Sequence, residues 1–265
     1  MVHRKADLPN SPSLNRRTGL AKPLSQIFIF CEGQTEQMYV DELASDAGRI
    51  NVEVDVVGEV GVPLTVVEAA VKKVASLRLA ASRRSASSFD KNYTVWAIFD
   101  KDEHPNIDKA YILANKNDVK IAFSNPCIEI WGLLHVHDLG DGEIHRHDAQ
   151  RLLSKLMDDY DHGDGAEFNY GMMRGVPYER AKQRANVLLN RRQEDGSPNG
   201  NPSTDIFVLT ESIFESAKLP EQRHSRATEI DIEISRLKNS PEYMNGCRAT
   251  HRRISELMTV LKELK

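Results

Sequence analysis

Residues 93–102 read YTVWAIFDKD, a run rich in aromatic and β-branched residues that ends in two aspartates. This composition is typical of a buried β-strand. Residues 27–31, IFIFC, form a second short apolar run, and Glu32 and Gly33 follow it directly. The sequence therefore predicts two buried strands with carboxylates at the points where they stop.

The segments around these two strands alternate between strand and helix patterns. Valines alternate over residues 52–57, and a further apolar strand pattern covers residues 119–123. Helical spacing is found over residues 35–44, from residue 63 onward, over 107–115 and over 128–135. We predict an α/β fold with four strands in a doubly wound, mainly parallel sheet, in which sites form beyond the carboxyl ends of the strands.

The rest of the chain divides by composition. Residues 1–24 hold five lysines and arginines against one aspartate and show no apolar periodicity, which predicts a flexible basic arm or a solvated tail without a partner. Residues 25–148 form the predicted α/β core. Beyond it the pattern is helical, with helices expected over 149–160, over 178–192, from about residue 204 and as a hairpin within 222–265. We assign residues 149–215 to a helical remainder and 216–265 to an appended helical segment.

Composition limits the classes of function. The net charge of −4 gives no global electrostatic case for nucleic-acid binding, so local charge has to provide it. There is neither a long apolar run nor a secretory signal, so we expect a cytoplasmic protein without membrane contact. The three cysteines are far apart and form no C-x-x-C pair, so we expect neither a disulfide framework nor a zinc knuckle.

The acidic residues at the strand ends suit a divalent cation. Asp100 and Asp102 leave one strand and Glu32 leaves another, so folding can bring three carboxylates together. Such charges repel one another by several kcal/mol at an effective dielectric of roughly 20, and a cation relieves this cost. Carboxylates are the ligands that Mg²⁺ and Mn²⁺ prefer. An isolated D-x-D more often only caps a helix, but its occurrence with the Glu32-Gly33 turn favours a functional site.

Three groups of residues resemble a known family. They are Cys31-Glu32-Gly33 with Thr35-Glu36, Phe99-Asp100-Lys101-Asp102, and Ser124-Asn125-Pro126-Cys127-Ile128-Glu129-Ile130-Trp131 with Leu133-Leu134-His135. In this order they resemble RloB-like proteins, which carry a Toprim domain. A weaker similarity at residues 201–204 extends the resemblance over about residues 25–215.

The resemblance implies a Toprim-like sheet with a catalytic glutamate at Glu32 and metal-binding aspartates at Asp100 and Asp102. It implies a Mg²⁺- or Mn²⁺-dependent nuclease that cleaves DNA or RNA, including tRNA, in antiphage defence or abortive infection beside an ATPase partner of the AAA or ABC type. Two departures, the compact turn before Glu36 and Val40 at a position where an aromatic is more usual, leave the direction of Glu36 open.

Other polar residues are supporting candidates. Glu36, Asn125 and Glu129 lie near the predicted sheet edge, although a capping or core role is open for Asn125 and Glu129. Lys101 is either a phosphate contact or only a charge neighbour of the aspartates. For nucleic-acid binding, the candidates are a cluster of cations in a stretch with few acids, within and just before the helix predicted over 178–192. They are Arg174, Arg180, Lys182 and Arg184.

Several other functions compete with a nuclease. His135, His137, His145 and His147 are a weaker candidate for a zinc site, and solvated histidines are the default. A haloacid-dehalogenase-like phosphatase also uses D-x-D, but His104 stands where that family has threonine or valine. The third alternative is a non-catalytic Toprim-like subunit that binds nucleic acid or acts as an adaptor in a defence complex, with the C-terminal hairpin joining an ATPase or a second copy in a homo-oligomer.

Overall fold

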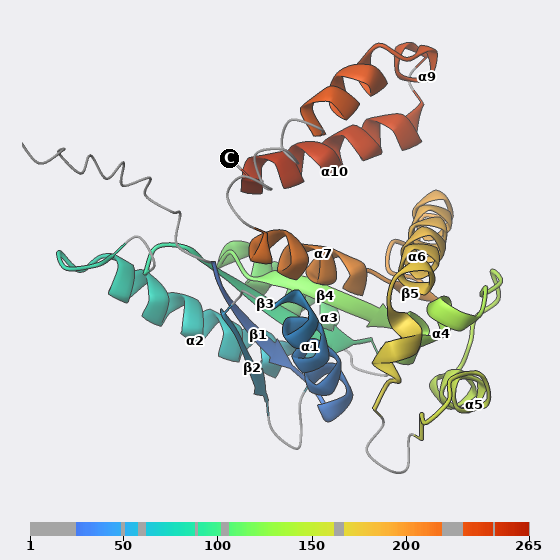
Figure 1. Cartoon of the computed structure of the whole chain (residues 1–265), viewed down its shortest axis with the longest axis horizontal. Coiled ribbons are helices and arrows are strands. Elements are labelled where there is room, and N and C mark those ends of the chain that lie inside the picture. The colour runs from blue at the N-terminus through green and yellow to red at the C-terminus, as the bar shows by residue number, and fades with distance from the viewer. Residues whose placement is uncertain are drawn as a thin grey trace, which may run out of the picture.

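The computed structural model describes residues 25–48, 51–57, 62–87, 90–101, 106–161, 167–218, 230–245 and 247–264. The predicted basic arm, residues 1–24, lies outside them. The described chain is an α/β structure whose sheet is flanked by helices, with a further helical region at the C-terminus (Figure 1). The predicted fold class is therefore confirmed.

The sheet has the strand order β2-β1-β3-β4-β5. The strands are β1 (Gln26–Cys31), β2 (Asn51–Val56), β3 (Tyr93–Asp100), β4 (Lys120–Asn125) and β5 (Ser203–Thr204). All neighbouring pairs are parallel except β4 and β5. The first seven helices are α1 (Gln34–Ala47), α2 (Pro63–Ala81), α3 (Ile107–Lys116), α4 (Glu129–Val136), α5 (Arg146–Leu156), α6 (Val176–Glu194) and α7 (Ile206–Ala217), with a 3₁₀ turn, η1 (Tyr170–Met173), before α6.

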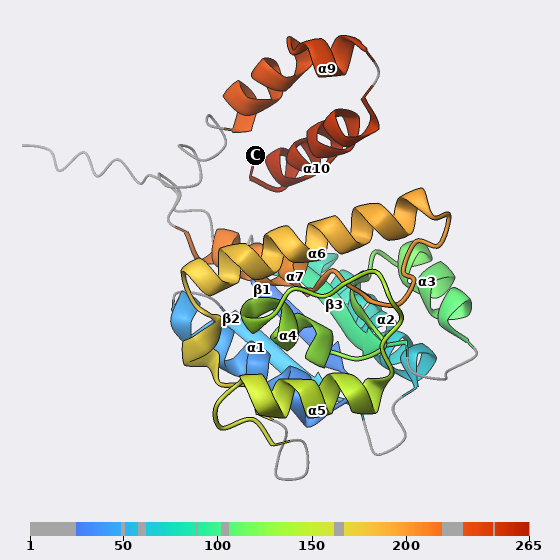
Figure 2. The same cartoon turned by 90° about the vertical axis from the view of Figure 1, so that its right-hand side faces the viewer.

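Alternating side chains of the central strands fill two separate cores. In β1, Ile27 and Ile29 face one core and Phe28 and Phe30 face the other. The first core is shared with α1, α4, α5, α6 and α7, and the second with α2 and α3. A continuous apolar strand is therefore explained by burial on both faces of a parallel sheet. Figure 2 shows α4 and α5 in front of the sheet with α6 above them.

The fifth strand corrects the sequence prediction, which had four strands and a helix from about residue 204. Ser203 and Thr204 instead pair antiparallel with Asn125 and Ser124, and the Ser124 and Thr204 hydroxyls lie 2.9 Å apart. α7 begins only at Ile206. Two residues are too few to show a strand period, so the sequence carried no signal for this edge strand.

Two helix boundaries also differ from the predicted ones. α5 covers Arg146–Leu156 instead of 149–160, because His145 is its N-cap and accepts a hydrogen bond from the backbone N of His147 at 3.3 Å. α6 covers Val176–Glu194 and is longer at both ends than predicted. Differences of a few residues are usual where no Ser, Thr, Asp or Asn cap marks the start of a helix.

The C-terminal region contains helical residues 230–238, α9 (Pro241–Met244) and α10 (Arg248–Leu264). These helices share a small core of Ile230, Ile234, Ile254 and Leu257. Arg252 of α10 reaches α6, where its Nη1 donates to Asn190 Oδ1 at 2.5 Å. Among the described residues, no helix has the length and apolar character that crossing a membrane requires.

Candidate functional site

The sheet topology brings the ends of β1 and β3 together at a point where the chain diverges. After β1 the chain passes through α1 to β2, and after β3 it passes through α3 to β4, which lies on the other side. α1 and α3 also pack on opposite faces of the sheet. In open α/β sheets, ligands bind in the crevice at such a switch point.

The strand register places Glu32 beside Asp100. Cys31 pairs with Ile98, so the turn residue after β1 lies level with the last residues of β3. Glu32 is partly buried, and its Oε2 accepts a hydrogen bond from the backbone N of Asp100 at 3.4 Å. Two of the three predicted site residues therefore meet at the switch point.

The Asp100 carboxylate has one satisfied and one unsatisfied oxygen. Oδ2 accepts a hydrogen bond at 3.1 Å from the backbone N of Ile128, directly before α4. Oδ1 is buried and has no hydrogen-bond partner among the described residues. A buried carboxylate oxygen without a partner is costly in a folded protein and requires an explanation.

Glu36 lies in the first turn of α1 and is only 5% exposed. A Cβ atom on Gly33 would lie 2.9 Å from Glu36 Oε2, so the glycine leaves the space that this carboxylate occupies. Burial raises the pKa of Glu36 to about 7, and the negative charges of Glu32 and Glu129 add to the rise. The Glu36 carboxyl is therefore buried near enough to Glu32 and Glu129 for their charges to raise its pKa.

Glu129 is the fourth carboxylate of the group and is 2% exposed. Its Oε1 accepts hydrogen bonds from Tyr160 Oη at 2.8 Å and from Gln150 Nε2 at 3.3 Å. Sequence analysis missed Tyr160 and Gln150. They are 31 and 21 residues away from Glu129 along the chain, and neither lies in a recognisable motif.

The group has a strongly acidic electrostatic environment. Burial raises the pKa of Asp100 well above its usual range, and three carboxylates add to the rise. These are Glu36, Glu129 and Glu32. Burial, followed by the charges of Glu129 and Asp100, also raises the pKa of the Cys127 thiol, so this thiol stays protonated. The carboxylates repel one another, and a cation between them would lower that cost.

The donor chemistry fits a hard divalent cation such as Mg²⁺ or Mn²⁺, because the oxygens are carboxylates and Asp100 Oδ1 lacks a partner in the described structure. Asp100 and Glu32 are the side chains that would hold it. The described ranges contain no group of three or more His, Cys, Asp or Glu side chains placed to hold a metal ion. The third predicted ligand, Asp102, lies outside the described residues.

Two supporting candidates have other surroundings. Lys101 is exposed, and its backbone N donates to the Ser124 carbonyl at 2.9 Å. Asn125 is 3% exposed, and its Nδ2 donates to the Asn199 carbonyl at 2.7 Å. The Asn125 amide therefore ties β4 to the loop before β5.

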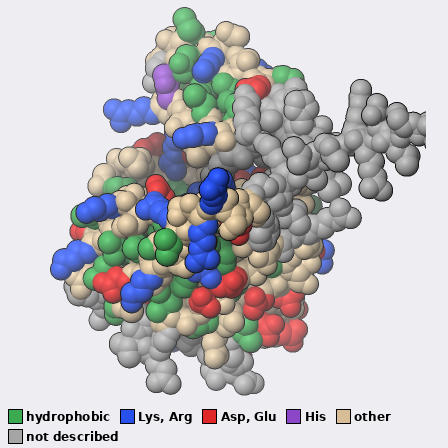
Figure 3. Space-filling view, turned by 90° about the vertical axis from the view of Figure 1, so that its left-hand side faces the viewer, with side chains coloured by type: hydrophobic (Ala, Val, Ile, Leu, Met, Phe, Trp, Pro, Cys, Tyr) green, Lys and Arg blue, Asp and Glu red, His purple; other side chains and the backbone are tan. Residues whose placement is uncertain are grey.

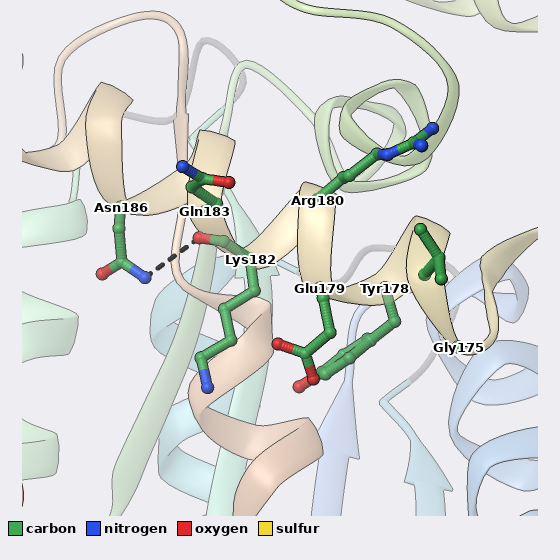
Figure 4. A pocket seen from close by; sticks show the side chains of 8 residues that line it. Gly175, Tyr178, Glu179, Arg180, Lys182, Gln183 and Asn186 are labelled. Atoms are coloured by element: carbon green, nitrogen blue, oxygen red, sulfur yellow. Dashed lines mark hydrogen bonds between the residues drawn. The ribbon is translucent and has the colours of Figure 1, made fainter.

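The cations predicted to bind nucleic acid mostly contact protein groups. Arg174 Nη2 lies 2.6 Å from Asp46 Oδ1, and Lys182 forms an ion pair with Glu211. Arg184 Nη1 donates to the Leu134 carbonyl at 2.7 Å. Arg180 is exposed, and Figure 4 shows it leaving α6 on a different side from Lys182. Arg180 and Lys182 both line a hollow on α6, whose lining does not include Arg174 or Arg184.

The four histidines do not form the zinc site that the sequence left open. His135 is 4% exposed at the end of α4, whereas His137, His145 and His147 are exposed. His135 Nδ1 lies 2.8 Å from the Trp131 carbonyl oxygen, and burial lowers the pKa of His135 to about 4. The default of solvated histidines is therefore wrong for His135, which is a neutral core residue.

Comparison with known proteins identifies the family. The model of the family described as RloB-like protein matches residues 27–213, which is more than half of the chain. A comparison with curated proteins and one with solved structures each found no match. The match includes both strand ends, the Cys127–Glu129 segment and the edge strand β5. The chain therefore belongs to the RloB-like protein family.

Proposed function

We propose that this protein is a divalent-metal-dependent nuclease of the Toprim type that cleaves phosphodiester bonds in DNA or RNA. The observation that carries the proposal is the meeting of Glu32 and Asp100 at the switch point between β1 and β3. The site lies where α/β proteins bind their substrates. The negative charges of its neighbouring carboxylates add to the burial that raises the pKa of Asp100.

Asp100, Glu32 and Glu129 have different roles in this proposal. Asp100, whose Oδ1 has no hydrogen-bond partner among the described residues, would hold Mg²⁺ or Mn²⁺ together with Glu32 from the neighbouring strand end. When bound, the cation polarises the scissile phosphate. Glu32 also acts as general acid or base, because it is only partly buried and can exchange protons with solvent and substrate. Tyr160 and Gln150 donate hydrogen bonds that position Glu129, whose negative charge acts on the pKa of Asp100.

The biological setting of the proposal is antiphage defence, with activity controlled by an ATPase partner of the AAA or ABC type. This setting rests on membership of the RloB-like family and on the resemblance of the motifs. Asp102 belongs to the proposed ligand set because it follows Asp100 by two residues.

The test is a comparison of variants in phage-challenged cells. Wild type, Glu32→Gln, Asp100→Asn and the control Glu42→Gln, an exposed position on α1, are expressed at equal levels. Cleaved tRNA and DNA are then profiled. We expect the first two variants to lose both defence and cleavage while the control retains them. Full defence by folded Asp100→Asn protein would refute catalysis and favour a non-catalytic adaptor.

A further inference from the structure

Several described cations of the core form ion pairs with neighbouring carboxylates. On the side of the molecule where α2 lies, Lys and Arg side chains stand among acidic and apolar ones (Figure 3). There, Lys73 pairs with Glu53 and Arg78 with Asp118. Most of the cations predicted to bind nucleic acid also contact protein groups. These ion pairs and hydrogen bonds leave the paired cations less available to a phosphate.

The outer face of α5 carries a hollow of about 550 Å³. Its lining residues are His147, Gln150, Arg151, Ser154, Lys155 and Asp161. Three of them, His147, Arg151 and Lys155, follow one another at intervals of four residues, so they form a stripe along one side of the helix. Successive members of the stripe are roughly 6 Å apart along the helix axis.

The floor of the hollow is joined to the acidic site by hydrogen bonds. Gln150 is 5% exposed, and its Oε1 lies 3.2 Å from His147 Nδ1. Its Nε2 donates to Glu129 Oε1, and the negative charge of Glu129 contributes to the raised pKa of Asp100. One buried side chain therefore separates the cationic stripe from the carboxylate group, and α5 lies beside α4 in Figure 2.

The cations of the stripe are accessible to a ligand. Lys155 is exposed and has no ion-pair partner in the described part of the chain. Arg151 pairs with Asp148, but both side chains are more than half exposed. Such a surface pair contributes at most about 1 kcal/mol, so a phosphate can replace it. Asp161 at the rim opposes binding and limits the affinity.

We propose that the hollow on α5 binds the sugar-phosphate backbone of the nucleic acid that the acidic site cleaves, an inference that rests on the proposed function. Arg151 and Lys155 supply two cations one helical turn apart along α5, which suits a chain of phosphates. The neighbouring carboxylates repel the same backbone unless a divalent cation is bound. The cations of the stripe therefore attract the nucleic-acid strand and offset its electrostatic repulsion by the neighbouring carboxylates.

The test measures binding without cleavage. Fluorescein-labelled single-stranded 20-nucleotide DNA and RNA are titrated with the protein in EDTA, and anisotropy is recorded between 50 and 200 mM NaCl. Wild type is compared with Arg151→Gln/Lys155→Gln. The matched control is Lys109→Gln/Lys116→Gln, which removes two exposed charges from α3. Circular dichroism checks folding, and Lys155→Gln alone replaces the double variant if that does not fold.

We expect the α5 double variant to bind at least tenfold more weakly at 50 mM NaCl than wild type, with the control within twofold. The slope of log affinity against log salt should become shallower by about 1.4, because each single-strand phosphate contact contributes about 0.7. Lys155→Gln should shift both quantities in the same direction by less. Equal affinities of the α5 variant and the control, or no binding of either oligonucleotide by wild type, would overturn the inference.

This result is separable from the proposed function. Unchanged binding by the α5 variant, together with loss of cleavage in Asp100→Asn, refutes the binding surface alone. Binding that depends on α5 in a protein that cleaves nothing refutes the nuclease and retains the surface.

Discussion

The buried position of Glu36 predicts that the metal-free protein loses stability as pH rises. The pKa of Glu36 is raised from its ordinary value of 4.5 to about 7, mainly by burial. Between these two values the folded state holds a proton that the unfolded state has released, so the free energy of unfolding falls with increasing pH. At roughly 1.4 kcal/mol per pKa unit, the loss is about 3 kcal/mol.

The perturbation that isolates this loss is Glu36→Gln, with Glu42→Gln on the exposed side of α1 as the control. Urea unfolding in EDTA is followed between pH 5 and 9 by the fluorescence of Trp96 and Trp131, which are both buried. At pH 8 to 9, Glu36→Gln should be more stable than wild type by about 3 kcal/mol, with the gain disappearing near pH 5. If Glu36→Gln and the control have the same pH dependence as wild type, the reasoning on burial of the Glu36 carboxyl is refuted.

Three further outcomes follow from other contacts. Gly33→Ala should keep the fold but weaken Mn²⁺ binding, measured by electron paramagnetic resonance. The new Cβ would lie 2.9 Å from Glu36 Oε2 and displace this carboxylate, whose negative charge acts on Asp100. Unchanged Mn²⁺ affinity would contradict this. Arg184→Gln should lower the free energy of unfolding by about 1–3 kcal/mol, since the Leu134 carbonyl loses its charged donor. Urea titration measures this change, and an unchanged free energy of unfolding would contradict the prediction. A thiol reagent should label Cys247 rapidly in the native protein and the other two cysteines slowly, because both are buried; three fast thiols would rule this out.

The sequence predicted those features that depend on local pattern. Apolar strands that stop at acids predicted where Glu32 and Asp100 lie, because parallel strands end at one edge of a sheet. Their actual contact depends on register and strand order, which no local pattern states. The two-residue strand Ser203–Thr204 was missed for lack of a period.

Side-chain partners were also beyond the reach of periodicity. A helical pattern shows which face of α6 is polar, but not that Arg184 binds the Leu134 carbonyl. The contacts of Glu129 with Gln150 and Tyr160 depend on how α5 and the loop after it pack on α4. The roles of Glu32, Asp100 and Asp102 in catalysis stay predictions.

The most direct measurement is Mn²⁺ titration of wild type and Asp100→Asn at pH 7.5, followed by electron paramagnetic resonance of the free ion. Carboxylates of Asp100 and Glu32 that form a cation site predict saturable binding by wild type and at least tenfold weaker binding by Asp100→Asn, with Glu42→Gln equal to wild type. Equal affinity of wild type and folded Asp100→Asn, or no binding by wild type, would contradict a divalent-cation site at the ends of β1 and β3.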